Sequence, residues 1–295
     1  MSARILVFGR TGQVAHALAD AASPFERVLA GRERLDLAAP DPDIAGLIAE
    51  TKPAAVINAA AFTAVDAAET ETGAALRLNR DAPARMAAAC AAADIPLVHI
   101  STDYVFDGEK GAPYVETDPR APINAYGAGK AAGEAALEAA AARGARLAVI
   151  RTSWVFAPNR GGFMGAMLGA RGREAVRVVR DQLGSPTPAD ACAGAALVLV
   201  QALLDRDGAA EGLFHAAGRD GVSRAELAEA LFAQLPRGPK VIPVDSTEFP
   251  TPARRPHDTR LSSAKLEAAF GWRAPTLADS IADYLARVRT LGALA

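Results

Sequence analysis

Cysteine and long apolar segments are scarce in this chain of 295 residues. The two cysteines, Cys90 and Cys192, do not form a CxxC pair. This excludes a disulfide framework and a cysteine-ligated zinc site, and it is typical of a reducing compartment. The longest apolar stretch, at 191–204, is too short to cross a bilayer, and the N-terminal apolar run stops at Gly9, too early for a secretory signal. We therefore expect a cytoplasmic protein with no membrane partner.

The chain also lacks a strong charge of either sign. Its 32 basic and 34 acidic residues leave a net charge of −2, so no overall attraction to nucleic acid is expected. The four histidines are scattered without ligand spacing, which predicts no metal site. Hydrophobic residues make up 51% and charged residues 22%, as in a folded globular protein.

The first half of the chain alternates short apolar runs with long alanine-rich stretches. The runs are apolar throughout, which is typical of strands buried on both faces. The expected strands are 4–8, 28–30, 54–58, 96–100 and 145–150. The expected helices are 13–22, 43–50, 67–92 and 124–143. Strands separated by helices predict an α/β fold with a doubly wound parallel sheet of Rossmann type.

Glycine and proline become more frequent after Arg151, and the alternation weakens. Helices are still expected at 188–204, 223–235 and 276–290, and strands at 176–179 and 213–215. We predict a dinucleotide-binding domain at 1–157, with later sheet elements from about 175–215. Residues 158–295 are then expected to form mainly a smaller, discontinuous substrate-binding lobe.

A glycine-containing turn stands where the first expected strand meets the first helix. Its residues are Gly9, Arg10, Thr11, Gly12, Gln13, Val14 and Ala15. Glycines let the backbone approach a pyrophosphate, whose charge is met by the helix N-terminus. The alternative interpretation is an ordinary strand–helix turn.

Two arginines bear on the choice of dinucleotide. Arg32 ends the second expected strand, where an arginine suits the 2′-phosphate of NADPH, and Arg10 adds a second positive charge. We therefore favour NADPH. Glu33 keeps NADH open, and a purely solvated Arg32 is the alternative.

A tyrosine and a lysine lie four residues apart on an expected helix, with a threonine upstream at the end of a strand. Tyr126 and Lys130 share one helix face, where an ammonium favours the phenolate and brings proton exchange nearer neutral pH. Thr102 lies where open α/β sheets bind ligands, placed to polarise a substrate carbonyl. Together these groups predict a carbonyl reductase, although Y-x-x-x-K alone is common on solvated helices.

Eight blocks along the chain carry a resemblance to a known family. They are GRTGQVA at Gly9, VINAAAFTAVDAAE at Val56, LRLNRDAPARMA at Leu76, HISTDYVFDG at His99, INAYGAGK at Ile123, RTSWVF at Arg151, DQLGSPT at Asp181 and RRPHDTRLSSAKL at Arg254. The sequence resembles the extended short-chain dehydrogenase/reductases and, within them, the dTDP-4-dehydrorhamnose reductase family.

The resemblance implies an NADPH-dependent reductase of a nucleotide-linked 4-keto-6-deoxy sugar, converting dTDP-4-dehydro-L-rhamnose to dTDP-L-rhamnose. The implied catalytic residues are Thr102, Tyr126 and Lys130, the last two also touching the cofactor. The implied cofactor contacts are Gly12, Gln13, Val14, Asp36, Leu37, Ala60, Ala61 and Phe62. The implied substrate contacts are Thr102, Asp103 and Trp154, and Arg255 is a candidate for the diphosphate. Core packing for Trp154 and a surface role for Arg255 stay open.

The chain departs from the family pattern at two positions. Phe62 stands where tyrosine or histidine is frequent, and Ala17 lies near the position of an acid that binds magnesium at a dimer interface in some members. A homodimer is possible, without that metal. Two other functions remain open: a sugar-nucleotide epimerase or dehydratase of the same superfamily, and a non-catalytic protein like the methionine adenosyltransferase regulatory subunit.

Overall fold

The architecture is built on one parallel sheet. The computed structural model describes residues 2–158 and 161–292. Across the main sheet the strands are β2 (Glu26–Ala30), β1 (Arg4–Phe8), β3 (Ala55–Asn58), β4 (Leu97–Thr102), β5 (Leu147–Thr152) and β10 (Gly212–His215). All neighbouring pairs are parallel. The predicted α/β class with a doubly wound parallel sheet is confirmed.

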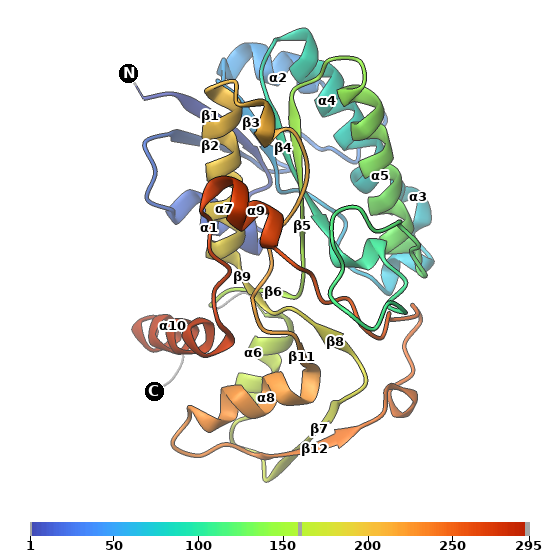
Figure 1. Ribbon diagram of the computed structural model, residues 1–295, viewed down its shortest axis with the longest axis vertical. Helices are drawn as coiled ribbons and strands as arrows, with labels where there is room; N and C mark the ends of the chain where they lie inside the picture. The colour runs from blue at the N-terminus through green and yellow to red at the C-terminus, as the bar shows by residue number, and fades with distance from the viewer. Residues whose placement is uncertain (1, 159–160, 293–295) are drawn as a thin grey trace.

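Helices cover both faces of this sheet (Figure 1). On one face lie α1 (Gln13–Asp20), α7 (Ala189–Leu204) and α9 (Ala264–Phe270). On the other lie α2 (Ile44–Thr51), α4 (Ala82–Ala92) and α5 (Ala125–Ala141). Successive residues of β1 point to opposite faces, so Ile5 and Val7 join the first core while Leu6 and Phe8 join the second. Burial on both faces explains why the strands are apolar throughout.

The helical stretch expected at 67–92 is divided. It contains a 3₁₀ turn (Ala67–Glu69), α3 (Thr72–Leu76), a π turn (Arg77–Asp81) and α4. Pro83 has no N–H to donate to the carbonyl of Asn79, which accounts for the irregular turn. Asn79 is fully buried, and its side chain holds both the N–H and the carbonyl of Phe62. The irregular turn therefore anchors the loop that follows β3.

Gly133 of α5 packs against this turn, and a Cβ there would lie 2.1 Å from the carbonyl oxygen of Asn79. We expect Gly133→Ala to lower the free energy of unfolding by about 1–3 kcal/mol, because backbone atoms must move. Equilibrium unfolding in urea measures this change in the free energy of unfolding. The control is Gly165→Ala in another helix, where nothing lies within 4 Å. Equal stabilities of the two variants would contradict the packing argument.

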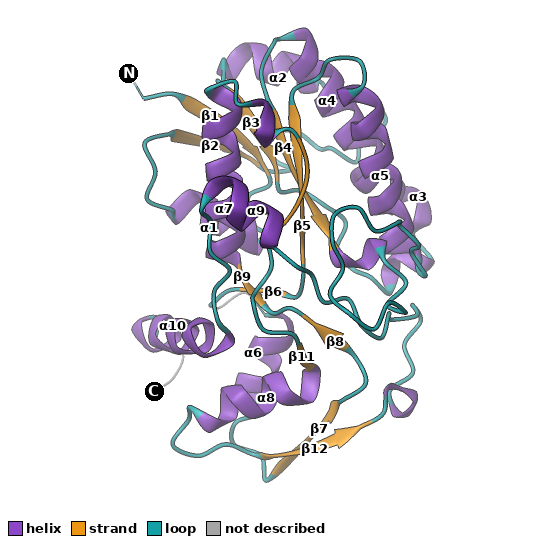
Figure 2. Cartoon of the chain, in the orientation of Figure 1, coloured by secondary structure: helices purple, strands orange, loops and turns teal. Residues whose placement is uncertain are grey.

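A smaller lobe lies below the sheet in the view of Figure 2. Its core is shared by α6 (Gly162–Gly169), α8 (Arg224–Ala233) and α10 (Leu277–Thr290). Beside α8, β7 (Ala175–Val179) pairs in parallel with β12 (Lys240–Val244). Between the lobe and the main sheet lie β6 (Val155–Phe156) with β9 (Thr187–Pro188), and β8 (Leu183–Gly184) with β11 (Val222–Ser223).

The strand expected at 176–179 forms but does not join the main sheet, contrary to its assignment among the later sheet elements. The place beside β5 is taken by β10, which pairs with it over four residues. Apolar composition suits either sheet, so only the pairing distinguishes them. In the described part of the chain, no helix is both long and apolar enough to span a membrane.

Candidate active site

A crevice opens where β1 and β3 lie side by side, because the chain proceeds from them toward opposite edges of the sheet. Gly9 begins the turn after β1 with φ +115°, and a Cβ there would lie 3.2 Å from the carbonyl carbon of Ala59. Only glycine allows both the conformation and the approach. Helix α1 begins at Gln13 with no side-chain cap and no acidic residue in its first turn. Its first N–H groups thus remain available to an anion.

A cavity of about 540 Å³ lies at the outer end of this crevice. Most of the predicted cofactor residues line it, namely Gly9, Arg10, Thr11, Gly12, Arg32, Asp36, Leu37, Ala60 and Ala61. Arg10 Nη1 donates to Glu33 Oε1 at 2.8 Å, and this contact lowers the pKa of Glu33. Arg32 Nε lies 3.8 Å from Asp36 Oδ1. Both predicted arginines therefore border the cavity, each beside a carboxylate.

A second cavity, of about 430 Å³, continues from the first past Thr11 and Gly12. It is lined by seven further candidates, namely Gln13, Val14, Thr102, Asp103, Tyr126, Lys130 and Trp154. Gln13 Oε1 and Thr152 Oγ1 are buried here with no hydrogen-bond partner among the described residues. A polar occupant would satisfy them. The turn, the free helix N-terminus and these unsatisfied atoms together suit a bound dinucleotide.

Thr102 is held by its neighbour Asp103. The Thr102 hydroxyl donates to Asp103 Oδ1 at 3.0 Å. Oδ2 of the same carboxylate accepts from Ser153 at 2.8 Å and from Thr259 at 2.6 Å. Burial raises the pKa of Asp103, which is only 3% exposed. Asp103 thus orients the threonine hydroxyl and is largely covered by its own partners.

Tyr126 and Lys130 both lie on α5, which begins after the Asn124 cap. Tyr126 is half-buried, and burial raises the pKa of its phenol while contact with the Thr102 hydroxyl lowers it. Lys130 is 1% exposed, and burial lowers the pKa of its ammonium to about 8. At neutral pH the phenol therefore carries its proton. The expectation that the Lys130 ammonium brings the pKa of Tyr126 nearer neutrality is wrong, because burial of the phenol outweighs it.

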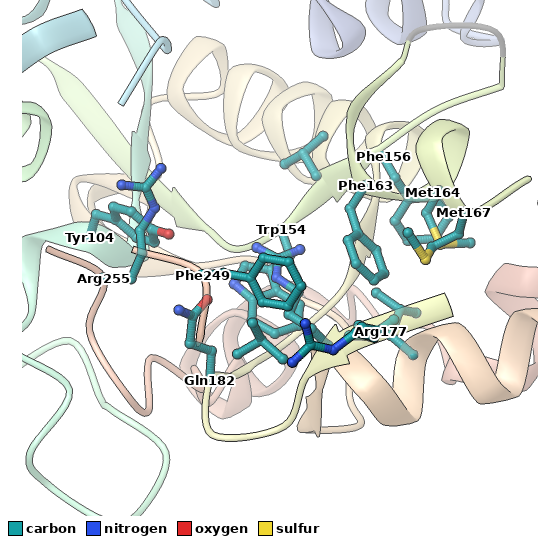
Figure 3. A pocket seen from close by; sticks show the side chains of 15 residues that line it. Tyr104, Trp154, Phe156, Phe163, Met164, Met167, Arg177, Gln182, Phe249 and Arg255 are labelled. Atoms are coloured by element: carbon teal, nitrogen blue, oxygen red, sulfur yellow. The ribbon is translucent and has the colours of Figure 1, made fainter. Parts of the chain in front are cut away.

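A third cavity, of about 490 Å³, lies in the smaller lobe (Figure 3). Trp154 lines both this cavity and the second one, so the two meet at its indole. The residue has φ +45°, an uncommon conformation for a bulky side chain, which indicates that its placement is constrained. Gly184 makes room for the ring, because a Cβ there would lie 2.2 Å from the indole.

Arg224 gives the third cavity a positive charge. Its Cζ lies 3.5 Å from the centroid of the Trp154 ring, and its guanidinium contacts the Tyr104 hydroxyl. Arg224 forms no ion pair within the described ranges, and Asp103 acts on it only through space. Arg255 lines the same cavity but makes a bidentate pair with Asp66 at 2.8 and 2.9 Å. The cavity thus combines aromatic walls with an arginine available to an anion.

Comparison with known proteins shows to which family the chain belongs. The model for the RmlD substrate binding domain matches residues 3–290. A protein of Sinorhizobium fredii named dTDP-4-dehydrorhamnose reductase is 39% identical over 284 residues, covering 94% of this chain and 95% of that one. The chain belongs to the dTDP-4-dehydrorhamnose reductase family.

Two solved structures of the same family have the same architecture. The dTDP-4-dehydrorhamnose reductase of Clostridium acetobutylicum superposes with a TM-score of 0.88 at 29% identity, covering 97% of this chain and 99% of that one. The enzyme of Bacillus anthracis, solved in complex with NADP, gives a TM-score of 0.87 at 28% identity, with 97% and 100% covered. The resemblance stated from the sequence blocks is confirmed.

Not every predicted site residue lines a cavity, and some residues that line one were not predicted. Phe62 lines neither cofactor cavity, whereas Thr63 lines both and was not predicted. Arg224 and Tyr104 were also missed. A signal for Arg224 existed: a positive charge at the first position of a helix opposes the helix dipole, so SRAE at 223–226 places it there at a cost.

Metal binding receives no support from clustered ligands. Within residues 2–158 and 161–292, no three His, Cys, Asp or Glu side chains lie together in a way that would hold an ion. The absence of a metal site stays a prediction.

Proposed function

We propose that this chain catalyses the NADPH-dependent reduction of dTDP-4-dehydro-L-rhamnose to dTDP-L-rhamnose. The observation that carries this proposal is the position of Tyr126 and Thr102, which line the cofactor cavity where it meets the smaller lobe at Trp154. We also infer that 1–157, with α7 and β10, holds the cofactor, while the rest of the chain holds mainly the sugar nucleotide. We further propose that the reaction takes place in the cytoplasm.

The reaction requires a proton donor beside a carbonyl oxygen. NADPH, when bound, supplies the hydride that C4 of the sugar receives. Tyr126 donates the proton to O4, because burial keeps its phenol protonated until that oxygen becomes basic. The Thr102 hydroxyl has a single proton, which it donates to Asp103 in this structure, so it holds the same oxygen in place by turning that proton from Asp103 to O4. Lys130 lines the same cavity, and its ammonium, which is the main form below its pKa of about 8, stabilises the phenolate that remains.

The third cavity is assigned to the nucleoside diphosphate. Arg224 lies against the Trp154 ring without a carboxylate partner among the described residues, so a diphosphate bound there would neutralise its positive charge. Arg255, already paired with Asp66, borders the same space. Phe249 and Phe163 offer apolar walls for a base or sugar (Figure 3).

A panel of keto-sugar nucleotides assayed with NADPH and NADH tests the proposal, with the product configuration determined by NMR. We expect NADPH consumption with the 4-keto-6-deoxy sugar of dTDP. A purified protein that retains nicotinamide and consumes no added NADPH would indicate an epimerase or dehydratase instead. No turnover with any sugar, together with stable capture of methionine adenosyltransferase, would indicate a regulatory subunit. Homodimer formation stays a prediction for size-exclusion chromatography.

Glu33 is expected to limit the preference for NADPH. Its carboxylate occupies Arg10 at the cavity that is assigned to the adenosine half. We expect Glu33→Gln to lower KM for NADPH roughly three- to tenfold, because repulsion of the 2′-phosphate is removed and Arg10 is released. KM for NADH is expected to change little. Initial rates with each cofactor measure this, and Glu26→Gln, at the exposed pair with Arg4, is the control.

A further inference from the structure

Three buried polar side chains, Lys130, His99 and Asn58, form a chain that begins one helical turn from the proposed catalytic Tyr126. Lys130 Nζ lies 3.1 Å from His99 Nε2 and donates to the carbonyl of Ile100 at 2.7 Å. On the other side of the ring, His99 Nδ1 lies 3.0 Å from Asn58 Nδ2. Asn58 and His99 are completely buried, and neither lines a cofactor cavity.

The orientation of Asn58 determines which nitrogen of His99 carries the proton. Asn58 Oδ1 accepts from the backbone N–H of Ala60 at 3.1 Å, so the amide must present its NH₂ group to the ring. His99 Nδ1 is therefore an acceptor. Burial lowers the pKa of His99 well below its usual range, so the ring is neutral. Because Nδ1 accepts from Asn58, the single proton of the ring lies on Nε2.

That proton faces Lys130. An ammonium has three donors and no acceptor, so a charged Lys130 would set two donors against each other across 3.1 Å. A neutral amine accepts from Nε2–H and still donates to Ile100. We propose that Asn58 and His99 act as positioning residues that disfavour the ammonium form of Lys130 and thereby set the alkaline limit of the reaction.

The charged groups around Lys130 do not explain why its ammonium form is disfavoured. Glu134, one turn further along α5, favours the ammonium, yet burial still brings the pKa of Lys130 down to about 8. The Glu134 carboxylate is itself bound by Arg151 from β5 and by Arg120 from the preceding loop. Tyr126, on the same helix, is protonated at neutral pH. His99 thus supplies the group from β4 that faces Lys130 directly.

This inference rests on the proposed roles of Tyr126 and Lys130, but its first test does not need activity. Long-range ¹H–¹⁵N spectra of the imidazole rings in the full chain report which nitrogen is protonated. The His99 signals are assigned by elimination in His16→Gln, His215→Gln and His257→Gln proteins. We expect His99 to be protonated at Nε2. Protonation at Nδ1 in the wild-type protein overturns the inference, whatever the enzyme turns over.

Asn58→Asp is the matched variant. A carboxylate of nearly the same shape can accept from Ala60 and also from Nδ1–H, so the tautomer should reverse and Nε2 should become an acceptor for the ammonium. The alkaline limb of kcat/KM should then move upward by on the order of one pH unit. A merely structural role would lower activity without moving the limb.

Two results of the variant would contradict the proposal. An unmoved limb in a folded Asn58→Asp protein, with its tautomer reversed, removes His99 from the control of Lys130. A moved limb with the proton still on Nε2 assigns the shift to the added charge alone. If the variant does not fold, the wild-type spectrum still decides the tautomer on which the proposal depends.

Discussion

Replacing Tyr126 by phenylalanine is expected to lower kcat by about 10²–10⁴, the usual contribution of a positioned proton donor. The phenol lies beside Thr102 at the rim of the cofactor cavity, and burial raises its pKa, so the hydroxyl arrives at the reaction still protonated. Phenylalanine keeps the ring and its edge-to-face contact with Tyr104, whose centroid is 5.8 Å away. Steady-state kinetics with the keto sugar and NADPH measure the loss.

Two controls accompany this variant. Binding of NADPH, followed by fluorescence titration, should be nearly unchanged, because the glycine turn and the α1 N-terminus are untouched. Tyr104→Phe removes a neighbouring phenol that contacts Arg224 instead, so its effect should fall mainly on KM for the sugar nucleotide. Full turnover by the Tyr126→Phe protein would remove Tyr126 from the mechanism.

Arg224→Ala is expected to lower kcat/KM for the sugar nucleotide by about 10²–10³, equivalent to roughly 3–4 kcal/mol. The guanidinium lies against Trp154 without a carboxylate partner among the described residues, so the substrate diphosphate is assigned as its counterion. Most of the loss should appear in KM, because the contact is made before and during reduction alike. KM for NADPH should change little.

Arg177→Ala provides the comparison in the same cavity. Its side chain is about half exposed, pairs with Glu248 and lies over Phe249, so we expect less than a tenfold change. Arg224→Lys keeps a charge but loses the planar stack on Trp154 and should recover only part of the affinity. Similar losses in the two alanine variants would place the diphosphate elsewhere in the cavity.

Local pattern was sufficient for much of the fold. The strand at Arg4–Phe8 was predicted with its observed bounds because a run apolar at every position is required when both faces of a strand are covered. The helix expected at 67–92 was not resolved into its parts. The π turn depends on Pro83 and on the close approach of Gly133 from a helix that is remote in sequence.

Some residues of the candidate site could likewise be nominated from the sequence, and others could not. Gly9, Tyr126 and Lys130 stand in short motifs whose spacing indicates their neighbours, so the sequence sufficed to nominate them. Arg224 belongs to no such motif and reaches Trp154 only when α8 packs below the sheet. Arg255 was nominated for the diphosphate and lines the same cavity as Arg224, but only the fold shows that its partner is Asp66, 189 residues away.

By itself the sequence determined the fold class through its hydrophobic periodicity and the family through the resemblance of eight blocks along the chain. Spacing within a few turns of chain was enough to nominate the residues of the nucleotide turn and of the Y-x-x-x-K helix. Only the tertiary structure decided that β7 pairs with β12 outside the main sheet, that Arg224 lies against the indole of Trp154, and that His99 lies between Asn58 and Lys130. Those outcomes depend on contacts between segments distant in sequence, and neither periodicity nor spacing within a segment encodes them.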